Sequence, residues 1–114
     1  MPYFKIETNQ LVDKPTNEQL LKDATAFACE LLGKPENYMM VSLQQGISMS
    51  FAGDTSPAAY VKLKSIGLKP DKCGDYSKSI CEFVESKLGI SPYRIYIDFA
   101  DIDGKMFGWN KKTF

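Results

Sequence analysis

The sequence of 114 residues contains no histidine and only one tryptophan. Histidine is the side chain whose ordinary pKa lies nearest neutral pH, so its absence excludes serine and cysteine triads that use a histidine base. Acid–base chemistry must instead use a perturbed carboxylate, lysine, tyrosine or thiol, or the α-amino group. Because the ordinary pKa of that amine is about 7.7–8.0, the chain terminus becomes a candidate base.

Cysteine is scarce, and its three positions, Cys29, Cys73 and Cys81, show no C-x-x-C spacing. An odd number of cysteines without a histidine to join them argues against both a zinc site and a disulfide framework. We therefore expect reduced thiols and no bound metal, with Cys29 and Cys81 as small core residues inside helices.

An excess of charge and long apolar runs are also missing. Lysine plus arginine and aspartate plus glutamate each total 14, so no net field favours a nucleic-acid partner. No apolar stretch approaches the roughly 20 residues that cross a bilayer, and no signal-peptide pattern opens the chain. The sequence predicts a soluble, cytoplasmic protein without membrane insertion, folded as a single domain over residues 1–114.

Two helical patterns, each closed by a glycine, stand out among the features that are present. The segment Thr16–Gln19 has the form of a capping box, and apolar residues follow at helical spacing until Gly33. A second amphipathic pattern runs from about Lys72 to Gly89. Both glycines are typical helix ends, so the sequence predicts two helices of similar design.

The two halves of the chain look like copies of one unit. Gly33 and Gly89 are 56 residues apart, and each is followed by a proline-containing turn and an apolar run. The same offset sets the alternating segment "YFKIET", residues 3–8, against "AYVKLK", residues 59–64. Each half therefore predicts the order β-α-β. Short extra strands are expected at Ile47–Phe51 and within "KMFGWN", residues 105–110.

Two tandem βαβ units predict an α+β fold, a four-stranded mixed sheet with both helices on one face. The segments "YMMVSL" and "RIYIDF", residues 38–43 and 94–99, carry apolar residues at both alternations, which is typical of strands covered on both sides. A partner subunit would supply the second cover, so we expect a homo-oligomer. The lysines at positions 62, 64, 69 and 72 are interpreted as a solvated edge.

The chain opens "MPYFKIET", with a proline directly before a strand-like run. Removal of Met1 would leave Pro2 as the terminus, with a rigid secondary amine. Burial of an amine disfavours its charged form and lowers its pKa, which would make it a base near neutral pH.

Five ordered motifs carry a family resemblance: "MP" at the start, "GKP" at 33–35, "SIG" at 65–67, "ISPYRIYIDF" at 90–99 and "GWNKKTF" at 108–114. With them the chain resembles the macrophage migration inhibitory factor (MIF) family of the tautomerase superfamily over essentially its whole length. The resemblance implies a homotrimer with active sites at subunit interfaces. It also implies cofactor-free keto–enol tautomerisation of small aromatic α-keto acids such as phenylpyruvate, or of dopachrome-like compounds.

The same resemblance assigns roles to single residues, with Pro2 as the catalytic base. The remaining implied positions all contact substrate: Lys34 and Ile66 beside Pro2, Tyr96 and Asp98 from the adjacent subunit, and Phe107, Trp109 and Phe114 at a hydrophobic rim. Relatives commonly carry asparagine where this chain has Asp98, and a carboxylate there would repel an anionic substrate. Ala58 and Val61 replace the two cysteines of a C-x-x-C found in other members, so the thiol–disulfide role of that motif is rejected.

Plainer interpretations stay open at several of these positions. Lys34 could simply complement a helix dipole, Asp98 could pair with Arg94 or Lys105, and Trp109 and Phe114 could be interface packing. At the level of function, the alternative to a tautomerase is a MIF-like cytokine, secreted without a signal peptide, that binds a receptor while its pocket is vestigial. A third reading is a trimeric scaffold with no site.

Overall fold

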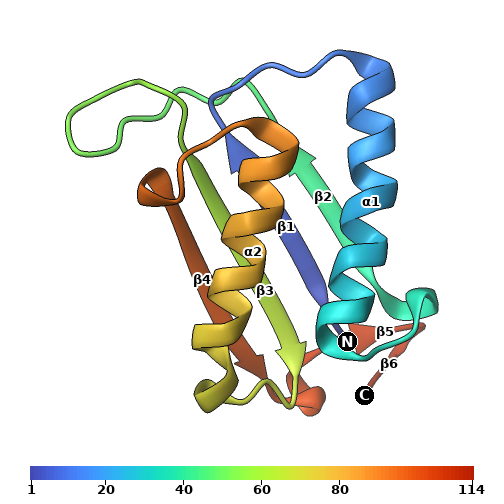
Figure 1. Ribbon diagram of the computed structural model, residues 1–114. Coiled ribbons are helices and arrows are strands. Elements are labelled where there is room, and N and C mark those ends of the chain that lie inside the picture. Colours follow the sequence, from blue (N-terminus) through green and yellow to red (C-terminus); the bar gives the residue numbers. More distant parts are fainter.

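The computed structural model describes residues 1–114 and shows one four-stranded sheet with both long helices packed on the same face (Figure 1). The elements in chain order are β1 (Tyr3–Thr8), α1 (Lys14–Leu32), β2 (Met40–Gln44), β3 (Ala59–Ile66), α2 (Cys73–Leu88), β4 (Ile95–Ile102), β5 (Gly108–Trp109) and β6 (Lys112–Thr113). Neither helix is long and apolar enough to cross a membrane.

The strand order β2-β1-β3-β4 confirms the predicted pair of βαβ units. Within each unit the two strands are parallel, β1 with β2 and β3 with β4. The units meet at the centre of the sheet, where β1 and β3 pair antiparallel with Tyr3 opposite Lys64 and Thr8 opposite Ala59. This mixed sheet with two helices on one face is the α+β architecture that the sequence predicts.

The helix ends follow the predicted glycines, but the first helix starts earlier than the capping box suggested. Asp13 is the N-cap of α1, and its side chain accepts a hydrogen bond from the Thr16 backbone N–H at 2.9 Å. Pro15 is tolerated in the first turn because that backbone nitrogen has no intrahelical acceptor. Gly33 and Gly89 end the helices in the left-handed conformation, at φ of 62° and 68°.

The core lies between the sheet and the two helices, and it repeats the 56-residue offset. Ala24 and Ala28 of α1 are buried, and so are Ile80 and Val84, which lie 56 residues further along in α2. They pack against the buried side chains of the two central strands, which are Phe4, Ile6, Val61 and Leu63. Residues at equivalent positions of the two units therefore pack into the core in the same way.

The opposite face of the sheet is more polar than expected. Lys5 and Glu7 form an ion pair at 2.9 Å, and the Tyr3 hydroxyl lies 2.7 Å from the Ser42 hydroxyl. Lys62 and Lys64 also lie on this face, on a central strand, so their interpretation as a sheet edge is wrong. The homo-oligomer expected to cover this face stays a prediction.

One of the two extra strands does not form. Residues 47–51 show a single bridge, between Phe51 and Asp54, and the Ile47 N–H bonds to the Thr8 carbonyl at 3.1 Å. The alternation that suggested a strand instead reflects packing, because Ile47, Met49 and Phe51 are half-buried while the serines between them are exposed. The second expected strand is confirmed as β5, which forms a hairpin with β6.

Candidate active site

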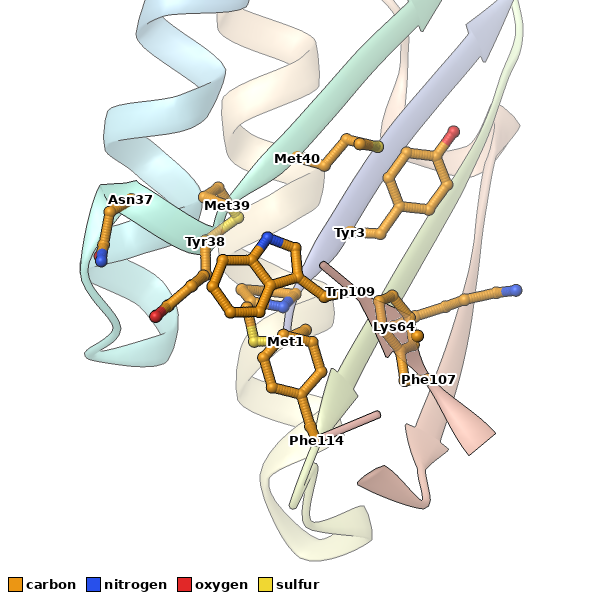
Figure 2. A pocket seen from close by; sticks show the side chains of 12 residues that line it. Met1, Tyr3, Asn37, Tyr38, Met39, Met40, Lys64, Phe107, Trp109 and Phe114 are labelled. Carbon is orange, nitrogen blue, oxygen red and sulfur yellow. The ribbon is translucent and has the colours of Figure 1, made fainter. Parts of the chain in front are cut away.

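A cavity of about 430 Å³ opens where the chain begins, at the end of the sheet that also carries the β5–β6 hairpin (Figures 1 and 2). Its lining is mostly apolar and consists of Met1, Pro2, Tyr3, Asn37, Tyr38, Met39, Met40, Lys64, Phe107, Gly108, Trp109 and Phe114. No aspartate or glutamate is among these residues. A concave apolar site with few polar groups is the usual form of a small-molecule pocket.

Four separate segments bring these residues together: the chain start, the turn into β2, Lys64 of β3 and the C-terminal residues 107–114. Pro2 is buried directly before β1, and its carbonyl accepts the Met40 N–H at 3.2 Å, which fixes the chain start against β2. The turn before β2 supplies Tyr38, and the C-terminal hairpin supplies Trp109. A two-residue turn closes that hairpin, with Asn110 in the left-handed conformation at φ of 51°.

An aromatic cluster forms one wall of the cavity. The rings of Trp109 and Phe114 are stacked, with centroids 5.6 Å apart and an interplanar angle of 14°. Tyr38 meets both edge-on, at centroid distances of 5.2 Å from Trp109 and 6.0 Å from Phe114. Figure 2 shows the two stacked rings beside Met1. Such a wall suits a flat ring of a ligand.

The electrostatics at the chain start favour a neutral amine. Burial lowers the pKa of the Met1 amino group below its ordinary value of 8.0, and the nearby Lys34 ammonium lowers it further. Met1 precedes Pro2 in the sequence, so the Pro2 nitrogen is an amide until Met1 is removed.

Lys34 is held in place by residues of β3. Its Nζ donates hydrogen bonds to the Ser65 hydroxyl at 2.6 Å and to the Ile66 carbonyl at 2.8 Å. Burial lowers the pKa of Lys34. The effect of Lys34 on the Met1 amine shows that its ammonium lies near the terminus, and Ile66 is held next to Lys34 by their hydrogen bond. Their predicted roles beside Pro2 stay a prediction.

The residues predicted from the sequence fall into two groups. Pro2, Phe107, Trp109 and Phe114 line the cavity, whereas Lys34 and Ile66 are not among the residues that line it. Tyr96 and Asp98 lie on β4, outside this cavity of the same chain.

Asp98 is not paired with Arg94 or Lys105, so that interpretation is wrong. Its carboxylate accepts a hydrogen bond from the Tyr60 hydroxyl at 2.6 Å and lies 3.9 Å from the Lys62 ammonium. The hydrogen bond to Asp98 raises the pKa of Tyr60. Arg94 instead donates to four backbone carbonyls of residues 51–57.

Sequence reasoning assigned no site role to eight lining residues: Met1, Tyr3, Asn37, Tyr38, Met39, Met40, Lys64 and Gly108. For two of them a signal was present. Tyr3 and Lys64 alternate with buried neighbours on β1 and β3 and face each other in the register. Once the two strands are paired, the position of Pro2 next to Tyr3 brings both side chains to the site.

Solved structures of similar proteins show which fold class this architecture belongs to. Two βαβ repeats with this sheet order form the tautomerase-like fold, and a crystal structure titled as a MIF homologue from Prochlorococcus marinus superposes with a TM-score of 0.91. That chain is 40% identical, with 98% of each chain covered. The structure of MIF from Trichinella spiralis gives a TM-score of 0.90 at 33% identity, covering 98% of this chain and 99% of that one.

The sequence comparisons agree with the fold. The family model described as "Macrophage migration inhibitory factor (MIF)" matches residues 1–114, so the chain belongs to the MIF family of the tautomerase superfamily. A MIF homologue of Trichinella spiralis is 36% identical over 116 residues, covering both chains completely. MIF of Xenopus tropicalis is 34% identical, covering 100% of this chain and 99% of the relative.

Proposed function

We propose that the protein, once Met1 is removed, is a cofactor-free keto–enol tautomerase that uses the Pro2 amine as general base. Its substrates would be small aromatic α-keto acids of the phenylpyruvate type, or dopachrome-like compounds. The observation that carries this proposal is that Pro2 is buried at a cavity with aromatic walls. Burial and the nearby Lys34 ammonium lower the pKa of the Met1 amine that precedes it, and the same surroundings would act on the Pro2 amine.

In the proposed reaction the neutral Pro2 nitrogen removes a proton from the carbon next to the substrate carbonyl. The electrons of that C–H bond form the C=C bond, and the carbonyl oxygen takes up the negative charge as an enolate. The protonated amine then gives its proton to this oxygen, which yields the neutral enol and restores the free base. Because the proton that Pro2 removes is returned to the product, the isomerisation needs no cofactor.

Lys34 would bind the substrate carboxylate, since its ammonium lies close to the terminus and carries donors for a charge-assisted hydrogen bond. Ile66 would add apolar contact next to it. Phe107, Trp109 and Phe114 would pack on the substrate ring. In a homotrimer, which we propose as the active form, Tyr96 and Asp98 would reach the same site from the adjacent subunit.

The test is turnover of phenylpyruvate by protein whose intact mass proves the loss of Met1. Pro2→Gly should lower kcat/KM by at least about 100-fold, the order expected for loss of a positioned base. A second preparation that retains Met1 behind a short extension should be inactive although folded. Circular dichroism and light scattering serve as controls for folding and assembly. Unchanged turnover in Pro2→Gly would refute the proposal.

A second candidate function is signalling, because the relatives are named for a factor that inhibits macrophage migration. In that case the protein would act as a MIF-like cytokine, released without a signal peptide, through a cell-surface receptor. Saturable cell binding that survives Pro2→Gly would support this role. Absence of saturable binding would exclude it.

A further inference from the structure

Three lysines lie on the open face of the two central strands, and two of them are neutralised. Lys5 pairs with Glu7 at 2.9 Å, and Lys62 pairs with Asp98 at 3.9 Å. Lys64 has no ion-pair partner. Its neighbours in the sheet register are Tyr3 on β1 and Ala100 on β4, neither of which carries a charge at neutral pH.

The lysine without a partner is also the one that lines the cavity. No aspartate or glutamate side chain of the same chain lines the cavity to neutralise it. Figure 2 shows the Lys64 ammonium pointing away from the rings of Trp109 and Phe114, with its stem at the cavity wall. The charge therefore lies outward from the aromatic wall.

Lys64 and Lys34 lie on opposite sides of the sheet. Ser65, which accepts the hydrogen bond from Lys34, is buried on the helix side of β3. Side chains alternate along a strand, so Lys64 projects to the open side. The Lys34 ammonium thus lies near the terminus, while Lys64 borders the cavity from the open side of the sheet, and one carboxylate on a ligand could neutralise only one of the two.

We propose that Lys64 is a second anion-binding residue of this cavity, and that the site prefers aromatic α-keto acids that carry a second acid group on the ring. This inference rests on the proposed tautomerase function. In this arrangement the keto-acid carboxylate binds near Lys34, the ring packs on Trp109 and Phe114, and the second acid group takes a charge-assisted hydrogen bond from Lys64. Lys64 acts as a specificity residue and takes no part in proton transfer.

The direct test compares phenylpyruvate with its 3-carboxy and 4-carboxy ring derivatives on the processed enzyme. The wild type should show a lower KM for at least one dicarboxylate than for phenylpyruvate, and Lys64→Met should raise that KM about 10-fold. At a half-exposed position, the loss of one charge-assisted hydrogen bond should change KM by about 10-fold. The KM for phenylpyruvate should change less than about 2-fold, because only the added carboxylate loses a partner.

Lys5→Met is the matched control, since Lys5 lies on the same open face of the central strands but outside the cavity. It should leave both KM values unchanged. An equal effect of Lys64→Met on both substrate types, or no preference of the wild type for a dicarboxylate, would overturn the inference while leaving the tautomerase function intact.

A binding measurement separates the two proposals fully. Trp109 is the only tryptophan of the chain and stands in the cavity wall, so its fluorescence reports occupancy without turnover. Phenylacetate and 4-carboxyphenylacetate, which lack the keto group, are suitable probes. Tighter binding of the dicarboxylate that disappears in Lys64→Met supports the second anion site even if no tautomerase activity is found. Equal binding of the two probes contradicts it.

Discussion

Phe27 of α1 and Phe83 of α2 stack on each other with ring centroids 4.4 Å apart and an interplanar angle of 20°. The two residues are 56 positions apart, so each is the copy of the other in the duplicated sequence. The contact therefore joins the two repeats through equivalent side chains. It also forms the main aromatic link between the helices that cover the sheet.

This stack should contribute measurable coupling to stability. Phe27→Ala and Phe83→Ala should each lower the free energy of unfolding by about 2 kcal/mol, below the range for full burial because both rings are half-buried. A double-mutant cycle in urea at fixed protein concentration should give a coupling of about 1 kcal/mol. Phe27→Ala combined with Phe51→Ala, which removes a distant ring, is the additive control. A Phe27–Phe83 coupling near zero would show that the stack contributes only buried area.

The activity should persist to lower pH than an ordinary terminal amine allows. The base works in its neutral form, and both burial and Lys34 lower the pKa of the Met1 amine from 8.0. Pro2 is buried, so its amine is expected to shift in the same direction after processing. The acid limb of kcat/KM should therefore have its midpoint below the ordinary pKa of a terminal proline amine. Lys34→Met should move the amine pKa upward, as measured by its acylation rate against pH, which requires no turnover.

The same shift has a defined consequence for stability. In the unfolded chain the amine has its ordinary pKa and binds a proton at higher pH than in the folded chain. Between the lowered pKa and about pH 8, the unfolded state thus holds more protons, and stability rises with pH. Blocking the amine by acetylation should flatten this part of the pH–stability curve. A curve that falls with pH in this window would contradict the sign of the shift.

Asp98→Asn should lower the KM for phenylpyruvate by only about 2-fold. The substitution removes a negative charge from β4, but Tyr60 and Lys62 already offset that charge. Asp98→Asn combined with Lys62→Met should show how much of the offset Lys62 supplies. A 10-fold or larger effect of Asp98→Asn alone would mean that the carboxylate acts on the substrate directly.

Arg94 should be needed to order the loop of residues 51–57. Its guanidinium donates to the carbonyls of Phe51, Asp54, Ser56 and Pro57 at 2.9–3.2 Å. Arg94→Lys keeps the charge but cannot span four acceptors, so it should resemble Arg94→Ala. Both variants should speed amide hydrogen exchange in the loop, with little change in β1. Equal protection in Arg94→Lys and wild type would refute this role.

The sequence predicted features that depend on local chemistry and missed those that depend on long-range pairing. Gly33 and Gly89 were correctly predicted as helix ends because glycine adopts the left-handed conformation readily, and this depends on the single residue alone. The start of α1 was misplaced because Asp13 and Thr16 can both cap a helix, and only the folded backbone selects Asp13. Lys64 was interpreted as part of a solvated edge because alternation assigns a face of the strand but does not reveal that Tyr3 lies opposite.

The candidate site was predicted to a similar extent. Pro2, Trp109 and Phe114 were found because they fall within motifs, Phe107 directly precedes the last motif, and all four share one cavity. Tyr38 and Met40 belong to no motif that carried the resemblance. They reach the cavity because the turn before β2 brings them beside the chain start, which is a consequence of the parallel pairing of β1 with β2.

The antiparallel pairing of β1 with β3 has a consequence for the order and rate of folding. Paired residues along it are separated by 51 positions at Thr8 and Ala59, and by 61 at Tyr3 and Lys64. Each βαβ unit can close locally, but the two half-sheets meet only when these distant segments find each other, which slows the search. Until then both half-sheets expose an unpaired edge that could pair with another chain. Dilution during refolding should therefore raise the yield of native protein.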